Sequence, residues 1–70
     1  MTVEKFLEMC EFGSSNITVF EVKYNGHTKY GLTEVDVYNT YKDKKVLHMY
    51  AYASGYDDGT ADVTVELEVE

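Results

Sequence analysis

Histidine and cysteine are the residues best suited to metal binding or nucleophilic catalysis, and this chain has two histidines and one cysteine. His27, His48 and Cys10 lie far apart in the sequence, and no two of them have the short spacing of a structural zinc site. We therefore interpret both histidines as strand residues and Cys10 as part of an apolar helical face. No metal, no cofactor and no catalytic residue is expected, so we do not predict an enzyme.

Several carboxylates surround a glycine between Tyr56 and Asp62, as they do in calcium-binding loops. An EF-hand loop, however, places oxygen ligands at alternate positions, glycine at the sixth and glutamate at the twelfth, between two helices. This segment has neither that spacing nor such flanks. Asp58-Gly59 between two strand-like runs is a hairpin signal, so we predict a turn.

Acidic residues are concentrated in the last 14 positions, which hold six of the 13 in the chain. These six are Asp57, Asp58, Asp62, Glu66, Glu68 and Glu70. Alternate residues of an extended strand repeat about every 6.6 to 7 Å, which is close to the spacing of phosphates along one nucleic-acid strand. The row therefore fits mimicry of nucleic acid, or a charged surface that keeps an edge strand from pairing with other molecules.

Tyrosine is abundant, with seven residues in a chain of 70. Tyrosine buries area at low entropic cost and keeps a polar tip, which is why interfaces are enriched in it. Some of the seven must fill the core. Tyr50 and Tyr52, however, alternate with Met49 and Ala51. If the latter two face the core, the two tyrosines are exposed side by side, and we predict them, with Tyr56, as contact residues.

The net charge of −7 comes from 13 carboxylates, six lysines and no arginine. This balance disfavours direct binding to nucleic acid. It favours a basic protein partner, or serves only solubility. A single cysteine cannot close an intramolecular disulfide, so a reducing cytoplasm is expected. The first residues contain no apolar run of signal-peptide length, and neither secretion nor a membrane is expected.

With 70 residues, the chain is expected to form one domain, residues 1–70. A chain of this size buries only about 60% of its unfolded surface, so residues that would line a deep cleft are needed in the core. Hydrophobic residues make up 44% of the sequence, which is enough for such a core. Function must then use an outer face.

Residues 2–12 have apolar side chains at helical spacing, namely Val3, Phe6, Leu7 and Cys10. Thr2 is the expected N-cap, and Gly13 is expected to end the helix. This pattern predicts a short helix with one buried face.

The period changes to two over residues 17–24, which are rich in β-branched and aromatic side chains. Asn25-Gly26 follows, and this dipeptide favours a type I′ turn. We therefore predict a hairpin with a return strand at residues 27–32, in which Gly31 marks a bulge or the exit.

Residues 33–43 fit two structures. Thr33 followed by Asp36 resembles a capping box, which favours a helix. Such a helix would align three side chains along one side, namely Val35, Tyr38 and Tyr41. Val35 and Val37, in alternate positions, favour a strand instead. We predict an irregular segment with a helical turn, followed by a polar turn at residues 42–45.

Residues 46–53 and 61–70 alternate again and predict two strands, with a turn over residues 55–59. One face of the first strand would hold Leu47, Met49, Ala51 and Ala53, and the other Val46, His48, Tyr50 and Tyr52. The core face of the second would hold Val63, Val65, Leu67 and Val69, opposite its acidic residues. The simplest architecture is an α+β fold, in which the N-terminal helix packs on a mainly antiparallel sheet of about four strands.

A short helix ending at Gly13, the run Ile17-Thr-Val-Phe20, the Asn25-Gly26 hairpin and an acidic alternating C-terminal strand form a characteristic layout. This layout resembles that of small acidic accessory proteins carried by bacteriophages and mobile elements, over the whole chain in size and charge. Some such proteins inhibit host defence, including anti-CRISPR and anti-restriction proteins that imitate nucleic acid. The resemblance implies a protein-binding role.

We therefore predict a non-catalytic acidic cytoplasmic module, of the host cell if it is encoded by a phage, that binds a basic protein such as a nuclease or a defence effector. Its contact residues would be Tyr50, Tyr52, Tyr56, Asp57, Asp58, Asp62, Glu66, Glu68 and Glu70. The alternative is a self-associating structural or assembly subunit, such as a homodimer. In it, a sheet edge pairs with a second copy and the apolar faces of residues 17–24 are partly buried between chains.

Overall fold

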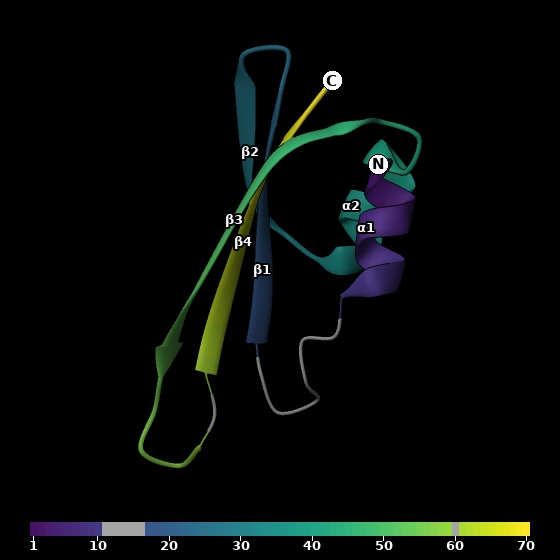
Figure 1. Cartoon of the computed structure of the whole chain (residues 1–70). Coiled ribbons are helices and arrows are strands. Elements are labelled where there is room, and N and C mark those ends of the chain that lie inside the picture. Colours follow the sequence, from purple (N-terminus) through teal and green to yellow (C-terminus); the bar gives the residue numbers. More distant parts are fainter. Residues whose placement is uncertain (11–16, 60) are drawn as a thin grey trace.

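The computed structural model describes residues 1–10, 17–59 and 61–70. Its elements are, in chain order, α1 (Val3–Met9), β1 (Ile17–Tyr24), β2 (His27–Leu32), α2 (Glu34–Tyr41), β3 (Val46–Gly55) and β4 (Ala61–Val69). The four strands form one mixed sheet in the order β2-β1-β4-β3, and both helices lie on the same side of it (Figure 1). The prediction of an α+β fold with an N-terminal helix on a four-stranded sheet is confirmed.

The order of the strands decides which backbones are free. β1 pairs antiparallel with β2 and parallel with β4, and β3 pairs antiparallel with β4. The acidic strand β4 is therefore an inner strand, and its charges do not protect a sheet edge; that interpretation is wrong. β1 is also an inner strand, so pairing between two sheets has to use β2 or β3.

Helix α1 begins as its sequence predicts and ends earlier. Thr2 is the N-cap, and its Oγ1 accepts a hydrogen bond from the backbone N–H of Lys5 at 3.3 Å. The helix ends at Met9 rather than at residue 12 because Cys10 has extended backbone angles. The prediction that Gly13 ends the helix lies outside the described residues. The buried face is Val3, Phe6 and Leu7, with Cys10 half-buried beside it.

The β1–β2 hairpin has the predicted turn. Asn25 and Gly26 have φ angles of 53° and 79°, and two consecutive positive φ values are what a type I′ turn requires. Gly31, with a φ of 68°, lies opposite the register shift between Phe20 and Val22, so the predicted bulge is confirmed. Phe20 and Val22 themselves are fully buried on the helix side of the sheet.

Residues 33–43 form more than the predicted helical turn, because a complete capping box starts helix α2. Thr33 Oγ1 accepts from the N–H of Asp36 at 3.1 Å, and Asp36 Oδ2 accepts from the N–H of Thr33 at 3.0 Å. The predicted stripe is partly wrong. The helix buries Val37 and Tyr41, one turn apart, while Val35 is 66% exposed.

A bulge near the start of β3 changes the predicted faces. The register with β4 shifts between Val46 and His48, so Val46 pairs with Val69 on the helix side, and not on the side of His48 as expected. A bulge adds one residue to one strand and so reverses the alternation at that point. Leu47, the added residue, is 52% exposed rather than part of the core. Beyond it, the strand alternates as predicted and runs on to Gly55.

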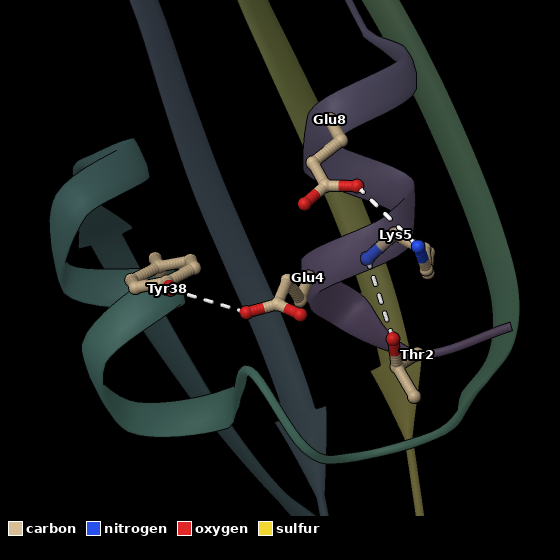
Figure 2. A network of polar contacts seen from close by, with 5 residues as sticks. All are labelled: Thr2, Glu4, Lys5, Glu8 and Tyr38. Atoms are coloured by element: carbon tan, nitrogen blue, oxygen red, sulfur yellow. Dashed lines mark hydrogen bonds and ion pairs between the residues drawn. The ribbon is translucent and has the colours of Figure 1, made fainter.

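The core lies between the helices and strands β1 and β4. Its buried members are Val3, Phe6, Leu7, Phe20, Val22, Val37, Tyr41, Val65, Leu67 and Val69. A surface contact also links the two helices, since the Tyr38 hydroxyl of α2 donates to Glu4 Oε2 of α1 at 3.1 Å (Figure 2). The helices therefore cover β1 and β4, whereas the residues of β3 from Leu47 to Gly55 are all exposed.

Candidate functional site: the open face of the sheet

The side of the sheet that faces away from both helices is not covered by any described part of the chain (Figure 1). Residues directly paired on neighbouring strands share a face, so the registers place on this side the alternate residues opposite the core. We term the open face the surface formed by Lys23 and Glu21 of β1, Thr28 and Tyr30 of β2, His48, Tyr50 and Tyr52 of β3, and Thr64, Glu66 and Glu68 of β4.

Transverse rows of side chains organise the open face. In one row, Glu21, Glu66 and Tyr50 are register partners across β1, β4 and β3. In the next, the partners are Lys23, Glu68 and His48. Tyr50 therefore borders the acidic pair Glu21 and Glu66 on the β3 side, and Lys23 lies in the next row.

Glu21 and Glu66 place two acidic side chains next to each other on this face. Partial burial raises the pKa of Glu21, and its hydrogen bond with Glu66 and the negative charge of Glu66 raise it further. Glu68 differs, because Lys23 Nζ lies 3.8 Å from its Oε2. The charge of Glu68 is thus partly balanced, whereas Glu66 is placed against a second carboxylate.

A hollow of about 330 Å³ follows this part of the face. Its lining consists of Glu21, Lys23, Thr28, Tyr30, His48, Glu66, Leu67 and Glu68. Most of the lining residues are polar or charged, whereas the pockets that bury small ligands are lined mainly by apolar residues. Its carboxylates and the ammonium group of Lys23 can form ion pairs and hydrogen bonds with a polar group that enters the hollow.

Tyr50 and Tyr52 lie side by side on β3. Their ring centroids are 5.8 Å apart with the planes tilted by 43°, and the residues are 56% and 47% exposed. The predicted exposure of both rings is confirmed, because Met49 and Ala51 occupy the helix side of the strand. Their role as contact residues stays a prediction.

The remaining predicted residues lie at the ends of β4. The Tyr56 hydroxyl donates a hydrogen bond to Asp62 Oδ2, and this bond, with the carboxylate charge, raises the pKa of Tyr56. Asp57 and Asp58 lie in the exposed turn between β3 and β4, and Glu70 follows β4 at its other end. The predicted residues thus divide into a group on the open face and a group at the hairpin tip.

Sequence reasoning missed Glu21 and Lys23, which the structure brings beside Glu66 and Glu68. Both alternate with the buried Phe20 and Val22, so the pattern of β1 already indicated that they face away from the core. The missing information was that β1 runs parallel to β4 and pairs with it, which the hydrophobic pattern of either strand does not specify.

The three residues whose types suit metal chemistry lie apart. His27 and His48 are exposed on β2 and β3, and Cys10 follows α1. Partial burial and the charge of Glu34 raise the pKa of Cys10, so its side chain is a thiol at neutral pH. Among the described residues, no three histidine, cysteine or acidic side chains gather closely enough to hold a metal ion.

Comparisons with protein-family models, with curated proteins and with solved structures find no match to this chain. In the part of the chain that the structure describes, no helix is long and apolar enough to cross a membrane.

Proposed function

We propose that the protein is a non-catalytic protein-binding module whose open face binds a basic surface of another protein. The observation that carries this proposal is the position of Glu21 beside Glu66 on an uncovered sheet. A lysine or arginine of the partner placed between the two carboxylates removes their mutual repulsion. It also forms charge-assisted hydrogen bonds, which are stronger than those between neutral groups.

Tyr50 adds packing to the same contact. It is the register partner of Glu66 on β3, and its ring lies against that of Tyr52. A cation held by Glu66 would lie near an aromatic ring, an arrangement that is worth about 0.5–1 kcal/mol at exposed sites and more when water is excluded. The carboxylates thus provide charge and orientation, and the tyrosines provide apolar area.

A nucleic-acid enzyme is the partner class that fits best, because the groove that holds its substrate is basic. The net charge of −7 would steer the two proteins together. The resemblance to phage and mobile-element inhibitors of host defence supports the same class. Since Lys23 partly balances Glu68, the mimicry would use the pair Glu21 and Glu66 across two strands rather than a single row along β4.

The first experiment passes a lysate of the native host over the immobilised protein at low and at high salt. The proposal expects a basic protein to be retained at low salt and released at high salt, because exposed charges are screened. The double variant Glu21→Gln and Glu66→Gln should no longer retain this protein at low salt.

The matched control, Glu8→Gln with Asp43→Asn, removes the same number of charges at exposed positions elsewhere. It should retain the same protein. Equal loss of the protein by the two double variants would show that net charge alone matters, and full retention by both would show that neither pair of charges matters. Either result would contradict a site on the open face.

A further inference from the structure

Strand β3 has an outer edge that is covered only where the strand begins. There Thr2 bridges Lys45, and the N–H of Val46 donates to the carbonyl oxygen of Met1 at 2.8 Å. From Leu47 to Gly55, β3 pairs with β4 on one side, and no described segment pairs with it on the other. In Figure 1 this stretch runs along the outside of the sheet.

The two edges of the sheet differ in how they are protected. β2 is short, carries Lys29 and is interrupted by the bulge at Gly31, and these are features that keep an edge from pairing with other chains. Beyond Leu47, β3 has no proline, no lysine and no acidic residue as far as Gly55. It exposes apolar side chains on both faces, including Met49 on the helix side, which is 44% exposed. Such an edge is suited to receive a strand.

We propose that β3 pairs antiparallel with β3 of a second copy of this chain, with the two-fold axis at Ala51. The free stretch from Leu47 to Gly55 is symmetric about that residue. Pairing centred there leaves no part of the free edge unused, because Leu47 then lies opposite the partner's Gly55. The two sheets join into one, with the helices of both copies on the same side.

Side chains match across this pairing. Met49 lies opposite the partner's Ala53, so apolar side chains meet on the helix side. Tyr50 lies opposite the partner's Tyr52, which extends the pair of rings already present on the open face into a group of four. Aromatic cross-strand pairs are among those that stabilise antiparallel strands.

Charges at the two ends of β3 favour a second copy as the occupant of this edge. Lys45 precedes the free stretch, Asp57 follows it, and both are exposed. In the antiparallel arrangement Lys45 approaches the partner's Asp57, and the same contact occurs again at the other end. A parallel arrangement would place lysine beside lysine and aspartate beside aspartate. The overall charge of −7 opposes dimerisation only weakly at physiological salt, where screening acts over about 8 Å.

The test measures the mass of the purified protein by light scattering from low micromolar to millimolar concentration. A dimer that dissociates on dilution is expected. Ala51→Lys places two ammonium groups opposite each other at the two-fold axis, and Ala51→Glu places two carboxylates there; like charges so placed are destabilising. Ala51 is exposed in the single chain, so both variants should fold, as circular dichroism would confirm. Each should weaken dimerisation at least about tenfold, which corresponds to 1.4 kcal/mol.

Mixing the two variants should restore the dimer, because lysine then faces glutamate. A wild-type protein that stays monomeric would overturn the proposal, as would dimers of unchanged strength in both variants. Species that keep growing beyond a dimer would also overturn it, since they indicate pairing of β3 with β2, which does not close. None of these outcomes depends on the binding of a basic partner.

A cross-link tests the register. In a Cys10→Ser background, Ala51→Cys places two thiols on opposed residues, whose Cα atoms are about 4.5–5.5 Å apart in antiparallel strands, within disulfide range. Ser54→Cys is the control, because its partner residue would be His48 and two Ser54 positions would lie about 20 Å apart along the strands. A disulfide dimer is expected at position 51 only. Efficient cross-linking at position 54 would show a different register and overturn the assignment of Ala51 to the axis.

Discussion

Glu21 and Glu66 are register partners on the parallel strands β1 and β4, on the face of the sheet that is turned away from α1 and α2. The contact costs folding energy at neutral pH, because partial burial, the hydrogen bond and the charge of Glu66 all raise the pKa of Glu21. A sheet that keeps such a pair on its surface is more stable when something outside the chain neutralises it. Stability and pH are therefore linked at this position, and the proposed binding of a basic partner would be linked to both.

Glu21→Gln should stabilise the protein at neutral pH. Since the pKa of Glu21 is higher in the folded than in the unfolded chain, the native state holds this proton more tightly. The resulting stability is fully present below the ordinary pKa of glutamate, about 4.3, and is lost as pH rises through the raised pKa. Glutamine carries no ionisable proton, so Glu21→Gln does not lose this stability as pH rises.

Urea unfolding at pH 7 and pH 4 checks this prediction. The variant should have a higher midpoint than the wild type at pH 7, and the difference should shrink at pH 4. Glu8→Gln, at an exposed position of α1 (Figure 2), should behave like the wild type at both values. A difference that is equal at both pH values would contradict the assigned cause.

Phe20→Ala should remove a large part of the stability of the chain. Phe20 is fully buried between the sheet and the helices, and replacing a buried phenylalanine by alanine costs about 3–5 kcal/mol. A chain of this length has a total stability of only about 3.5–10 kcal/mol at the usual stability per residue. Val35→Ala, at an exposed site of α2, should change stability by less than about 0.5 kcal/mol. Circular dichroism during thermal unfolding distinguishes the two outcomes.

Thr33→Ala should destabilise helix α2 by about 1 kcal/mol, the usual cost of losing an N-cap side chain. The backbone N–H of Thr33 and its hydroxyl both lower the pKa of Asp36, the backbone bond more strongly. Asp36 therefore contributes stability above its ordinary pKa, and this contribution is lost as pH falls through the lowered pKa.

NMR titration of Asp36 measures this effect in the same variant. Without the hydroxyl, the pKa of Asp36 should move part of the way back towards its ordinary value, because the backbone hydrogen bond remains. Thr40→Ala, at the other end of α2, should leave this pKa unchanged. An unchanged pKa in Thr33→Ala would contradict the contribution of the Thr33 hydroxyl to the lowered pKa of Asp36.

Local features of this fold could be predicted from the sequence, and the arrangement of the strands could not. Asn25 and Gly26 specify their turn because few residues adopt positive φ, and Thr2 and Thr33 cap helices through bonds to residues three positions later. The parallel pairing of β1 with β4 joins residues more than forty positions apart, such as Glu21 and Glu66. That pairing decided both main features of the surface, the acidic pair and the free edge of β3.

The bulge at Leu47 shows a second limit. The alternation from Val46 onward looks regular, so the sequence places Val46 with His48, whereas one added residue reverses the order at the start of the strand. Val35 shows the same limit for a helix, because apolar spacing alone does not tell which of two neighbouring stripes meets the sheet.

Tyr52→Ala should weaken partner binding by a similar factor at low and high salt, whereas Glu66→Gln should weaken it mainly at low salt. In the proposed interface, the ring of Tyr52 would contribute buried apolar area, which salt does not screen. Glu66 would contribute charge, which salt does screen. Truncation of an aromatic residue at the centre of an interface costs at least about 2 kcal/mol, or roughly thirtyfold in affinity. Tyr38→Ala is the matched control, because Tyr38 is similarly exposed but lies on α2 beside Glu4. Calorimetric titration of the captured partner at two salt concentrations measures both effects. Loss of affinity in Tyr38→Ala but not in Tyr52→Ala would move the binding surface to the helices.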